Sequence, residues 1–314
     1  MDNANVNEWD SGREFVDLRW DAGFKAVLGD PANKGILIDF INTILAPERR
    51  IRDIVKYADR ELEGLTPQNR AGRLDLRCID DEGRELLIEM QNESAGAFFQ
   101  RCVWYCSKIY SGELVPGEDY DRLTPVYLIS VLGDTFPHED KGRWGPDDIV
   151  SRYRMTEIRT GEVAPETFFI NFVELGRFVK TRPEEIGSRL EWLCYIFTHP
   201  EEMSRVLETS EDGFVRDLVG ACKVAGFTPP KRIEYEKNML NEMDIRMKLK
   251  SATAKGHLQG HEEGFEEGVE KGREEGREEE RLAIAKNFLD MGIPCEKVAE
   301  ATGLDIAVVE GMKK

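Results

Sequence analysis

The segment RLDLRCIDDEGRELLIEMQ, residues 73–91, restricts the possible folds of this chain more than any other part of it. It divides into two extended arms around Asp81-Glu82-Gly83, which suits a three-residue hairpin loop with glycine in the left-handed position. Such a turn pairs residue 80 with residue 84 and so sets the register of the two strands. One face of the hairpin is then predicted to be wholly apolar, with the cross-strand pairs Leu74–Met90, Leu76–Ile88 and Cys78–Leu86.

The opposite face of this hairpin is predicted to be acidic. The same register sets Asp75 opposite Glu89, and Gln91 lies on that face because strand side chains alternate. Two facing anions repel each other by roughly 0.2–1 kcal/mol relative to a neutral pair. A divalent cation would offset this repulsion, since Mg²⁺ binds one or two carboxylates together with waters and phosphate oxygens. The alternative is an ordinary half-exposed hairpin in which Arg73 and Arg77 pair with the two acids.

The order of these polar residues resembles that of known nucleases. An Asp on one strand followed by Glu-x-Lys on the next is typical of the PD-(D/E)XK nuclease superfamily, and this chain has Asp75 and then Glu89-Met90-Gln91. The glutamine variant, followed by Phe98-Phe99-Gln100-Arg101 and by Tyr105, resembles the bacterial family of recombination-promoting nucleases and transposases.

The similarity to this family extends over nearly the whole chain. Residues 21–25, DAGFK, are similar to its D-x-x-F-K motif, and residues 33–45, NKGILIDFINTIL, are similar to its Asn-Lys pair and the helix that follows. Residues 123–132, LTPVYLISVL, and the glycine repeat near the C-terminus are also similar. No single one of these motifs is decisive, but their order is specific.

The resemblance implies an α/β fold: a restriction-endonuclease-like core with a mixed central sheet flanked by helices, here followed by a C-terminal helical tail. It also implies a metal-dependent DNA endonuclease that hydrolyses phosphodiester bonds and promotes recombination or serves a mobile element. Asp75 and Glu89 would bind the metal, with the backbone carbonyl of Met90 as a third ligand. The cofactor would be Mg²⁺ or another divalent cation such as Mn²⁺ or Ca²⁺, and the partner would be DNA.

Gln91 stands where the superfamily pattern has a lysine. A lysine would stabilise the attacking hydroxide and the charge that develops on the phosphorus centre, whereas a neutral amide only orients water or a phosphate oxygen. Either Lys25 or Lys108 therefore reaches the site from a helix, or the metal alone activates the water. The resemblance suggests that glutamine is the form of this family, so Gln91 stays among the expected catalytic residues.

Two helical segments offer further polar groups. Arg101, Tyr105 and Lys108 share one helix face by their spacing, and Arg101 and Tyr105 are expected to bind substrate phosphate. The alternative is a solvated helix face. Asp21 and Lys25, four residues apart, form either a surface ion pair or the edge of the site, and the resemblance favours a substrate-binding role for Asp21.

Hydrophobic periodicity predicts the remaining elements of the core. Residues 31–45 and 97–114 are predicted helices, and residues 51–57, 125–132 and 166–175 are predicted strands. The six cysteines form no zinc-ligand spacing and are expected to be reduced and mostly buried. The chain has no run of 18 apolar residues and no apolar leader at its N-terminus, so we expect a cytoplasmic protein without a membrane segment.

The net charge of −18 indicates that the protein does not coat DNA nonspecifically, because proteins that do so have a basic surface. Positive charge must therefore be concentrated locally. Glycine recurs at every fourth position from residue 256 to residue 276, which predicts a helix whose backbone approaches a partner helix and hence a homo-oligomer. The alternative is a solvated linker helix.

Residues 282–314 are predicted to form three short helices separated by glycines. Their spacing resembles that of a helix-turn-helix, but the segment lacks arginine, and self-association is at least as strong an alternative as DNA reading. We expect four parts: a nuclease core (12–136), a mixed α/β extension (137–230), a long glycine-repeat helix (231–281) and the C-terminal module (282–314). The competing function is that of a catalytically degenerate nuclease fold acting as an oligomeric, DNA-associated interaction module.

Overall fold

The computed structural model describes residues 14–45, 49–62, 72–92, 97–114, 117–138, 141–145, 148–165 and 167–312. The chain divides into two compact units, residues 1–243 and residues 244–314. The helices are α1 (Asp21–Leu28), α2 (Lys34–Ile44), α3 (Phe98–Gly112), α4 (Arg189–Thr198), α5 (Met203–Thr209), α6 (Gly213–Ala221), α7 (Pro229–Asp290), α8 (Cys295–Thr302) and α9 (Ile306–Gly311). The strands are β1 (Ile54–Tyr57), β2 (Glu61–Leu62), β3 (Gly72–Arg73), β4 (Leu76–Asp80), β5 (Glu85–Gln91), β6 (Val126–Leu132), β7 (Val150–Tyr153) and β8 (Phe168–Glu174).

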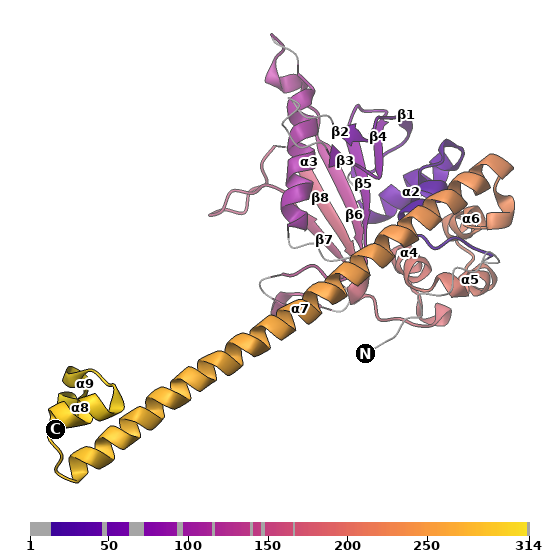
Figure 1. Ribbon diagram of the computed structural model, residues 1–314. Coiled ribbons are helices and arrows are strands. Elements are labelled where there is room, and N and C mark those ends of the chain that lie inside the picture. Colours follow the sequence, from indigo (N-terminus) through magenta and orange to yellow (C-terminus); the bar gives the residue numbers. More distant parts are fainter. Residues whose placement is uncertain are drawn as a thin grey trace. The chain divides into compact units, whose positions relative to one another are not determined.

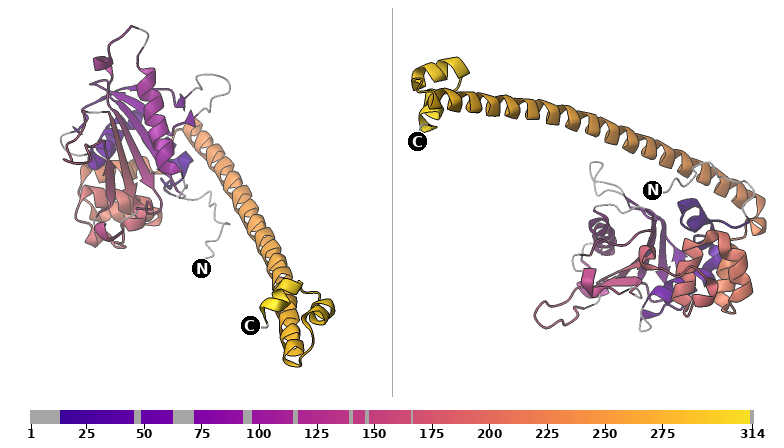
Figure 2. Two further views of the ribbon diagram at one scale, coloured as in Figure 1. Left: turned by 90° about the vertical axis from the view of Figure 1, so that its left-hand side faces the viewer. Right: turned by 90° about the horizontal axis from the view of Figure 1, so that it is seen from below.

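The first unit is built on a six-stranded mixed sheet in the order β1-β4-β5-β6-β8-β7. Strands β5, β6 and β8 run parallel, whereas β1, β4 and β7 pair antiparallel with their neighbours. Helix α3 covers one face of the sheet, and the group of α2, α4, α5 and α6 lies on the other side (Figures 1 and 2). The expected α/β fold with a mixed central sheet flanked by helices is confirmed.

Two hydrophobic clusters hold these layers together. The larger one packs α1, α2 and α4–α6 against the sheet, and the rings of Phe24, Phe40 and Phe197 meet there with centroids 6.3–6.5 Å apart. The smaller one packs α3 against the other face through Cys102, Cys106 and their neighbours. Strand β6, VYLISVL, is buried at every position, as expected for a parallel strand covered on both faces.

The predicted hairpin register is confirmed in strands β4 and β5. Leu76 pairs with Ile88 and Cys78 with Leu86, and Gly83 has the left-handed φ of 79° that the tight turn requires. The prediction for Leu74 is wrong: its side chain belongs to the α3 cluster on the opposite face of the sheet. The chain before Leu76 does not pair with β5 but pairs with β2 instead. This change of partner places the Leu74 side chain on the opposite face of the sheet.

The predicted elements of the core occur close to their expected ranges. The segment 31–45 forms a 3₁₀ turn, η1 (Pro31–Asn33), followed by α2, and residues 97–114 form α3. Strand β1 begins only at Ile54, and the strand expected at 166–175 is β8. Glu166 lies outside the described residues. Five of the six cysteines are buried and all six are free thiols, as expected.

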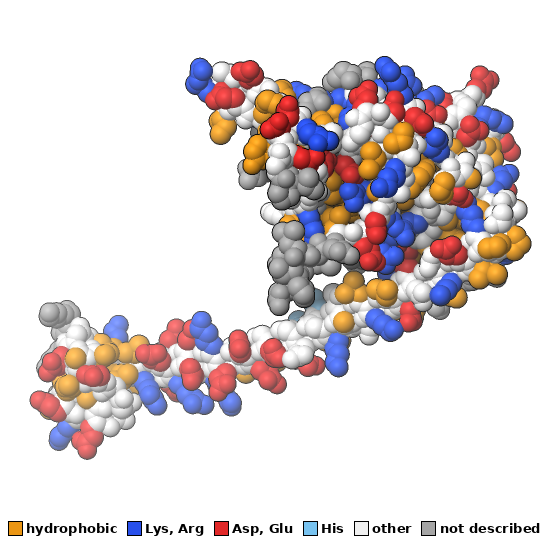
Figure 3. Space-filling model, turned by 90° about the horizontal axis from the view of Figure 1, so that it is seen from above, with side chains coloured by type: hydrophobic (Ala, Val, Ile, Leu, Met, Phe, Trp, Pro, Cys, Tyr) orange, Lys and Arg blue, Asp and Glu red, His pale blue; other side chains and the backbone are white. Residues whose placement is uncertain are grey.

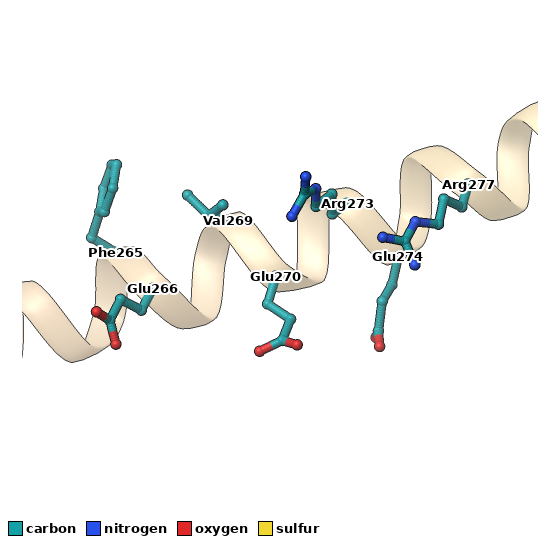
Figure 4. Close-up of a pocket in the computed structure, with 7 residues that line it drawn as sticks. All are labelled: Phe265, Glu266, Val269, Glu270, Arg273, Glu274 and Arg277. Carbon is teal, nitrogen blue, oxygen red and sulfur yellow. The ribbon is translucent and has the colours of Figure 1, made fainter.

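The second unit contains most of α7 and the helices α8 and α9. Acidic and basic side chains are interspersed along α7 (Figure 3). The four-residue repeat aligns side chains in rows: Phe265 and Val269 share one side of the helix, whereas Glu266 and Glu270 share another (Figure 4). Each row drifts slowly around the helix, because four residues exceed one turn.

Helix α7 continues to Asp290, so residues 282–290 are not the separate short helix that we predicted. Ala285, near the end of α7, packs with Val298 of α8 and Val309 of α9 in a small core. Gly292 and Gly303 have left-handed φ values of 82° and 69° at the two turns, which explains the glycines between these helices. Among the described residues, no helix is both long and apolar enough to cross a membrane.

Candidate active site at the bend between strands β3 and β4

Asp75 lies at a bend where the chain changes its pairing partner. Before the bend, Arg73 pairs with Glu61, and the Leu74 N–H donates a hydrogen bond of 2.9 Å to the carbonyl of Arg60. After the bend, the ladder with β5 begins at Leu76. The backbone N–H of Asp75 is therefore free of either ladder and is available to a side chain.

Hydrogen bonds from two backbone N–H groups, those of Asp75 and Met90, hold Asp75 and Glu89 side by side. The Asp75 N–H donates to Glu89 Oε1 at 3.1 Å, and the Met90 N–H donates to Asp75 Oδ2 at 2.8 Å. These reciprocal bonds fix two carboxylates side by side, although Asp75 lies beyond the last β4–β5 pair. The sequence therefore predicted the neighbours correctly but not the way in which they are joined.

Both carboxyl groups are held in an environment that favours their protonated forms. Glu89 is only 6% exposed, and burial followed by the nearby Asp75 carboxylate raises its pKa. Burial and then the Asp21 carboxylate raise the pKa of Asp75, and the Lys25 ammonium opposes that rise. Positive charge supplied to this site would stabilise both ionised forms.

Helix α1 brings a lysine to the carboxylates. Lys25 Nζ lies 3.2 Å from Asp75 Oδ1 and 2.6 Å from Asp21 Oδ1. Asp21 and Lys25 are one turn apart, so this pair is an i,i+4 contact that also reaches across to the bend. Of the two lysines considered from the sequence, Lys25 is the one that the structure places beside Asp75.

Helix α3 brings Arg101 near the site but directs Tyr105 and Lys108 elsewhere. Arg101 Nη2 donates to Gln91 Oε1 at 2.5 Å, and its charge favours the ionised form of Glu89. The Tyr105 hydroxyl donates to the Arg73 carbonyl at 3.4 Å, and Lys108 Nζ donates to the Leu62 carbonyl at 3.2 Å. Both of these side chains hold the β2–β3 pair against α3. Tyr105 is buried rather than part of a solvated stripe.

Sequence reasoning missed three residues around the site. Arg60 Nη1 donates to the Asp75 carbonyl at 3.4 Å, and Glu242 of α7 accepts hydrogen bonds from the first turn of α1. Neither leaves a local signal, because both act across long stretches of chain. Ser130 pairs with Glu89 across β5 and β6, and its buried hydroxyl has no hydrogen-bond partner. The sequence did offer a signal for Ser130, because a serine is unusual within the otherwise apolar strand VYLISVL.

The oxygen donors at the bend suit a hard divalent cation. Asp75 and Glu89 offer carboxylates, and the Met90 carbonyl lies on the same edge of β5 as the Met90 N–H, which points at Asp75. This is the oxygen-only ligand type that Mg²⁺ prefers. In the part of the chain that the structure describes, no group of three or more His, Cys, Asp or Glu side chains forms a metal site. A cation here would rely on two carboxylates, a backbone oxygen and water or phosphate.

Comparison with known proteins identifies the family. A family model described as PD-(D/E)XK nuclease family transposase matches residues 18–252. No curated protein and no solved structure matches the chain. The match covers the sheet, the bend with Asp75 and Glu89, and helices α1 to α6. The chain therefore belongs to the family of PD-(D/E)XK nuclease transposases.

Proposed function

We propose that this protein is a divalent-metal-dependent DNA endonuclease that hydrolyses phosphodiester bonds and promotes recombination or acts with a mobile element. The observation that carries the proposal is the pair of reciprocal hydrogen bonds that fixes Asp75 beside Glu89, 3.2 Å from a lysine. Two oriented carboxylates and one ammonium are the groups that phosphodiester hydrolysis needs. The family match supports a nuclease-type function.

Each residue of the site has a separate role in the proposed hydrolysis. Asp75, Glu89 and the Met90 carbonyl would hold the cation, which when bound lowers the pKa of a water and offsets phosphate charge. Lys25 would place its positive charge against a non-bridging phosphate oxygen, the role that lysine has in the superfamily pattern. Gln91 would orient a water or phosphate oxygen, while Arg101 holds that amide by a hydrogen bond.

Arg101 is the proposed phosphate-binding side chain of α3. Its Nε atom is buried without a hydrogen-bond partner, so the guanidinium has donor capacity left beside Glu89. Asp21 would hold the Lys25 ammonium in position rather than contact DNA directly, because it already pairs with that ammonium. Tyr105 and Lys108 would contribute by supporting β2 and β3.

Two further parts of the proposal concern where the enzyme acts and how it assembles. The protein would act in the cytoplasm, which the six free cysteines support. It would assemble through the glycine-repeat helix. The alternative is a catalytically degenerate member of the family that serves as an interaction module.

Nicking of supercoiled plasmid DNA by the purified full-length protein tests the proposed activity. We expect cleavage in Mg²⁺ or Mn²⁺ and none in a chelator. Asp75→Asn and Glu89→Gln should each lower the rate by about 10²-fold or more, because each removes a carboxylate that would hold the cation. The same two variants should lose the rise in melting temperature that Mn²⁺ gives the parent.

Glu85→Gln is the matched control for these variants. Glu85 is a buried carboxylate on the same strand, and it is held by two hydrogen bonds from Arg77, away from the bend. Its substitution should reduce stability but not the cleavage rate. If Glu89→Gln nicked DNA as fast as the parent, Glu89 would have no part in the reaction. A parent protein that folds and binds Mn²⁺ without nicking would support the interaction module.

A further inference from the structure

A cavity of about 910 Å³ opens beside the carboxylates, in the unit that contains residues 1–243. Its walls come from α1, η1, β1, the start of β4 and the first turns of α7. Its volume lies in the upper part of the range found for pockets that bind small organic molecules. The cavity is therefore large enough to hold more than one ring system.

Two cations connect this cavity with the site. Lys25 lines the cavity and also lies 3.2 Å from Asp75 Oδ1. Arg60 lines it too, and its Nη1 donates to the Asp75 carbonyl at 3.4 Å. A polymer that occupied the cavity would consequently lie against two side chains that contact Asp75.

The charge of the lining differs from that of the whole chain. Four basic side chains line the cavity against three acidic ones, whereas acids outnumber bases by 61 to 43 in the chain. Lys231 is paired with Asp30, and Arg77 is paired with Glu85. Arg60 differs from these two because its hydrogen bond goes to a neutral carbonyl. Its positive charge can therefore bind a phosphate.

Two tyrosines are among the residues that line the cavity. Tyr57 comes from β1, and its buried hydroxyl has no hydrogen-bond partner. Tyr235 comes from α7, and Phe227 holds its ring edge-on at a centroid distance of 5.8 Å.

Aromatic rings and a phosphate-binding cation together suit an unpaired strand. In duplex DNA the faces of the bases are stacked on one another, so tyrosine rings can stack only on bases that are unpaired. Each such base is stabilised by about 1–3 kcal/mol, with little dependence on its identity. Arg60 would hold the backbone of such a strand while the rings hold its bases.

We infer that this cavity binds a single-stranded segment of DNA next to the cleaved phosphate, so that the substrate is DNA with an unpaired stretch at the cleavage point. The direction of the strand toward Asp75 rests on the proposed function, whereas the binding of single-stranded DNA does not. An endonuclease with such a cavity cuts nicked, branched or melted DNA in preference to intact duplex.

Binding is measured by fluorescence anisotropy with a labelled single-stranded oligonucleotide and with the duplex of the same sequence, in the presence of a chelator. The full-length parent should bind the single strand more tightly than the duplex. Tyr235→Ala should weaken binding of the single strand by about 5- to 150-fold, and Tyr235→Phe should retain it, because the ring rather than the hydroxyl stacks. Arg60→Gln should lower the salt dependence of single-strand binding by about 0.7 in slope, the value for one lost phosphate contact.

Tyr120→Ala and Arg154→Ala are matched controls, because both side chains are exposed and neither lines the cavity. An oligonucleotide that carries 5-iodouracil should crosslink to peptides containing Tyr57 or Tyr235. Equal affinity for single strand and duplex would overturn the inference. So would equal losses in Tyr235→Ala and Tyr120→Ala, or crosslinks elsewhere on the chain.

The two proposals fail in different ways. If the protein nicked plasmid DNA but did not bind single-stranded DNA in the cavity, this inference would be wrong and the proposed function would still hold. If the protein bound single-stranded DNA through Tyr235 and Arg60 but nicked no DNA with any divalent cation, only the proposed function would be wrong.

Discussion

At the scale of single residues, Asp75 and Glu89 lie where burial disfavours both of their negative charges. The pair is nevertheless fixed by reciprocal hydrogen bonds, so neither side chain can turn toward solvent without losing a partner. Burial is the main cause that disfavours their ionisation, and the neighbouring Asp21 and Lys25 charges act on Asp75 in opposite directions.

Stability of the metal-free protein should depend on pH through Glu89. Burial, followed by the Asp75 carboxylate, raises the pKa of Glu89 to about 8, whereas an unfolded chain has its ordinary value of about 4.3. Between these values the folded state binds a proton that the unfolded state has released. The free energy of unfolding must therefore fall as the pH rises through this window.

Glu89→Gln lacks this titration and is the reference. From about pH 5 to about pH 8, the parent should lose on the order of 1–3 kcal/mol relative to Glu89→Gln in urea unfolding with a chelator present. Tryptophan fluorescence is a suitable probe, because all five tryptophans lie within residues 1–243. A difference that stays constant with pH would mean that Glu89 is ionised in the folded protein throughout.

Lys25 and Lys108 should differ in their effects on catalysis. Lys25→Met should lower the single-turnover rate in saturating Mg²⁺ by about 10²-fold, because it removes the ammonium that lies beside Asp75. Lys108→Met should leave that rate unchanged and reduce stability, since Lys108 Nζ bonds the Leu62 carbonyl and lies 5.0 Å from the Trp104 ring centroid. Equal and small effects of both substitutions on the rate would instead support activation of water by the metal alone.

At the scale of secondary-structure elements, helix α1 depends on a residue from far along the chain. Its N-cap residue, Trp20, makes no side-chain cap hydrogen bond. Glu242 of α7 takes over this role, because its two carboxylate oxygens accept from the N–H groups of Asp21 and Ala22 at 3.2 Å each. The position of Lys25, one turn further along α1, therefore depends on α7.

Removing this cap should affect both stability and activity. Glu242→Ala should lower the free energy of unfolding of the first unit by about 0.5–2 kcal/mol, the usual range for a lost helix cap. It should also slow cleavage, because Lys25 loses part of its support. Glu236→Ala is the matched control on the same helix, since Glu236 makes an exposed ion pair with Arg232. That control should change stability by less than about 0.5 kcal/mol. An equally small effect of Glu242→Ala would show that α1 holds its position without α7.

At the scale of the whole molecule, the second unit carries six glycines in one row of α7. A Cβ added at any of them meets nothing within 4 Å in a single chain. An isolated helix would therefore accept alanine at these positions and gain helix propensity. A partner backbone packed on that row would be pushed away by the added methyl groups.

The glycine row is tested by replacing Gly260, Gly264, Gly268 and Gly272 together with alanine. Intrinsic helix propensity rises by ~3–4 kcal/mol in sum, yet we expect the assembly state in sedimentation to fall. Alanine at Glu262, Glu266, Glu270 and Glu274 is the matched control, because it changes another row of the same period. An unchanged assembly state with higher helicity would make this segment a solvated linker.

The sequence by itself determined those features that depend on neighbours along the chain. The turn at Gly83 and the alternation of side chains were enough to set the register of β4 and β5, and periodicity was enough to locate α2, α3 and β6. That register also predicted that Asp75 lies near Glu89, although Asp75 is beyond the last β4–β5 pair. Helices α4 to α6 and strand β7 were not predicted, because their signals are short and their packing partners lie far away in the sequence.

The tertiary structure alone decided the rest. Pairing of β3 with β2 turned Leu74 to the opposite face, bent the chain at Asp75 and so released its N–H for Glu89. Helix α1 rather than α3 supplied the lysine, and α7 supplied its cap. These outcomes depend on which elements pack together, and packing depends on the total burial of apolar surface rather than on local spacing. The same dependence brought Tyr57, Arg60 and Tyr235 around one cavity, although no motif joins them.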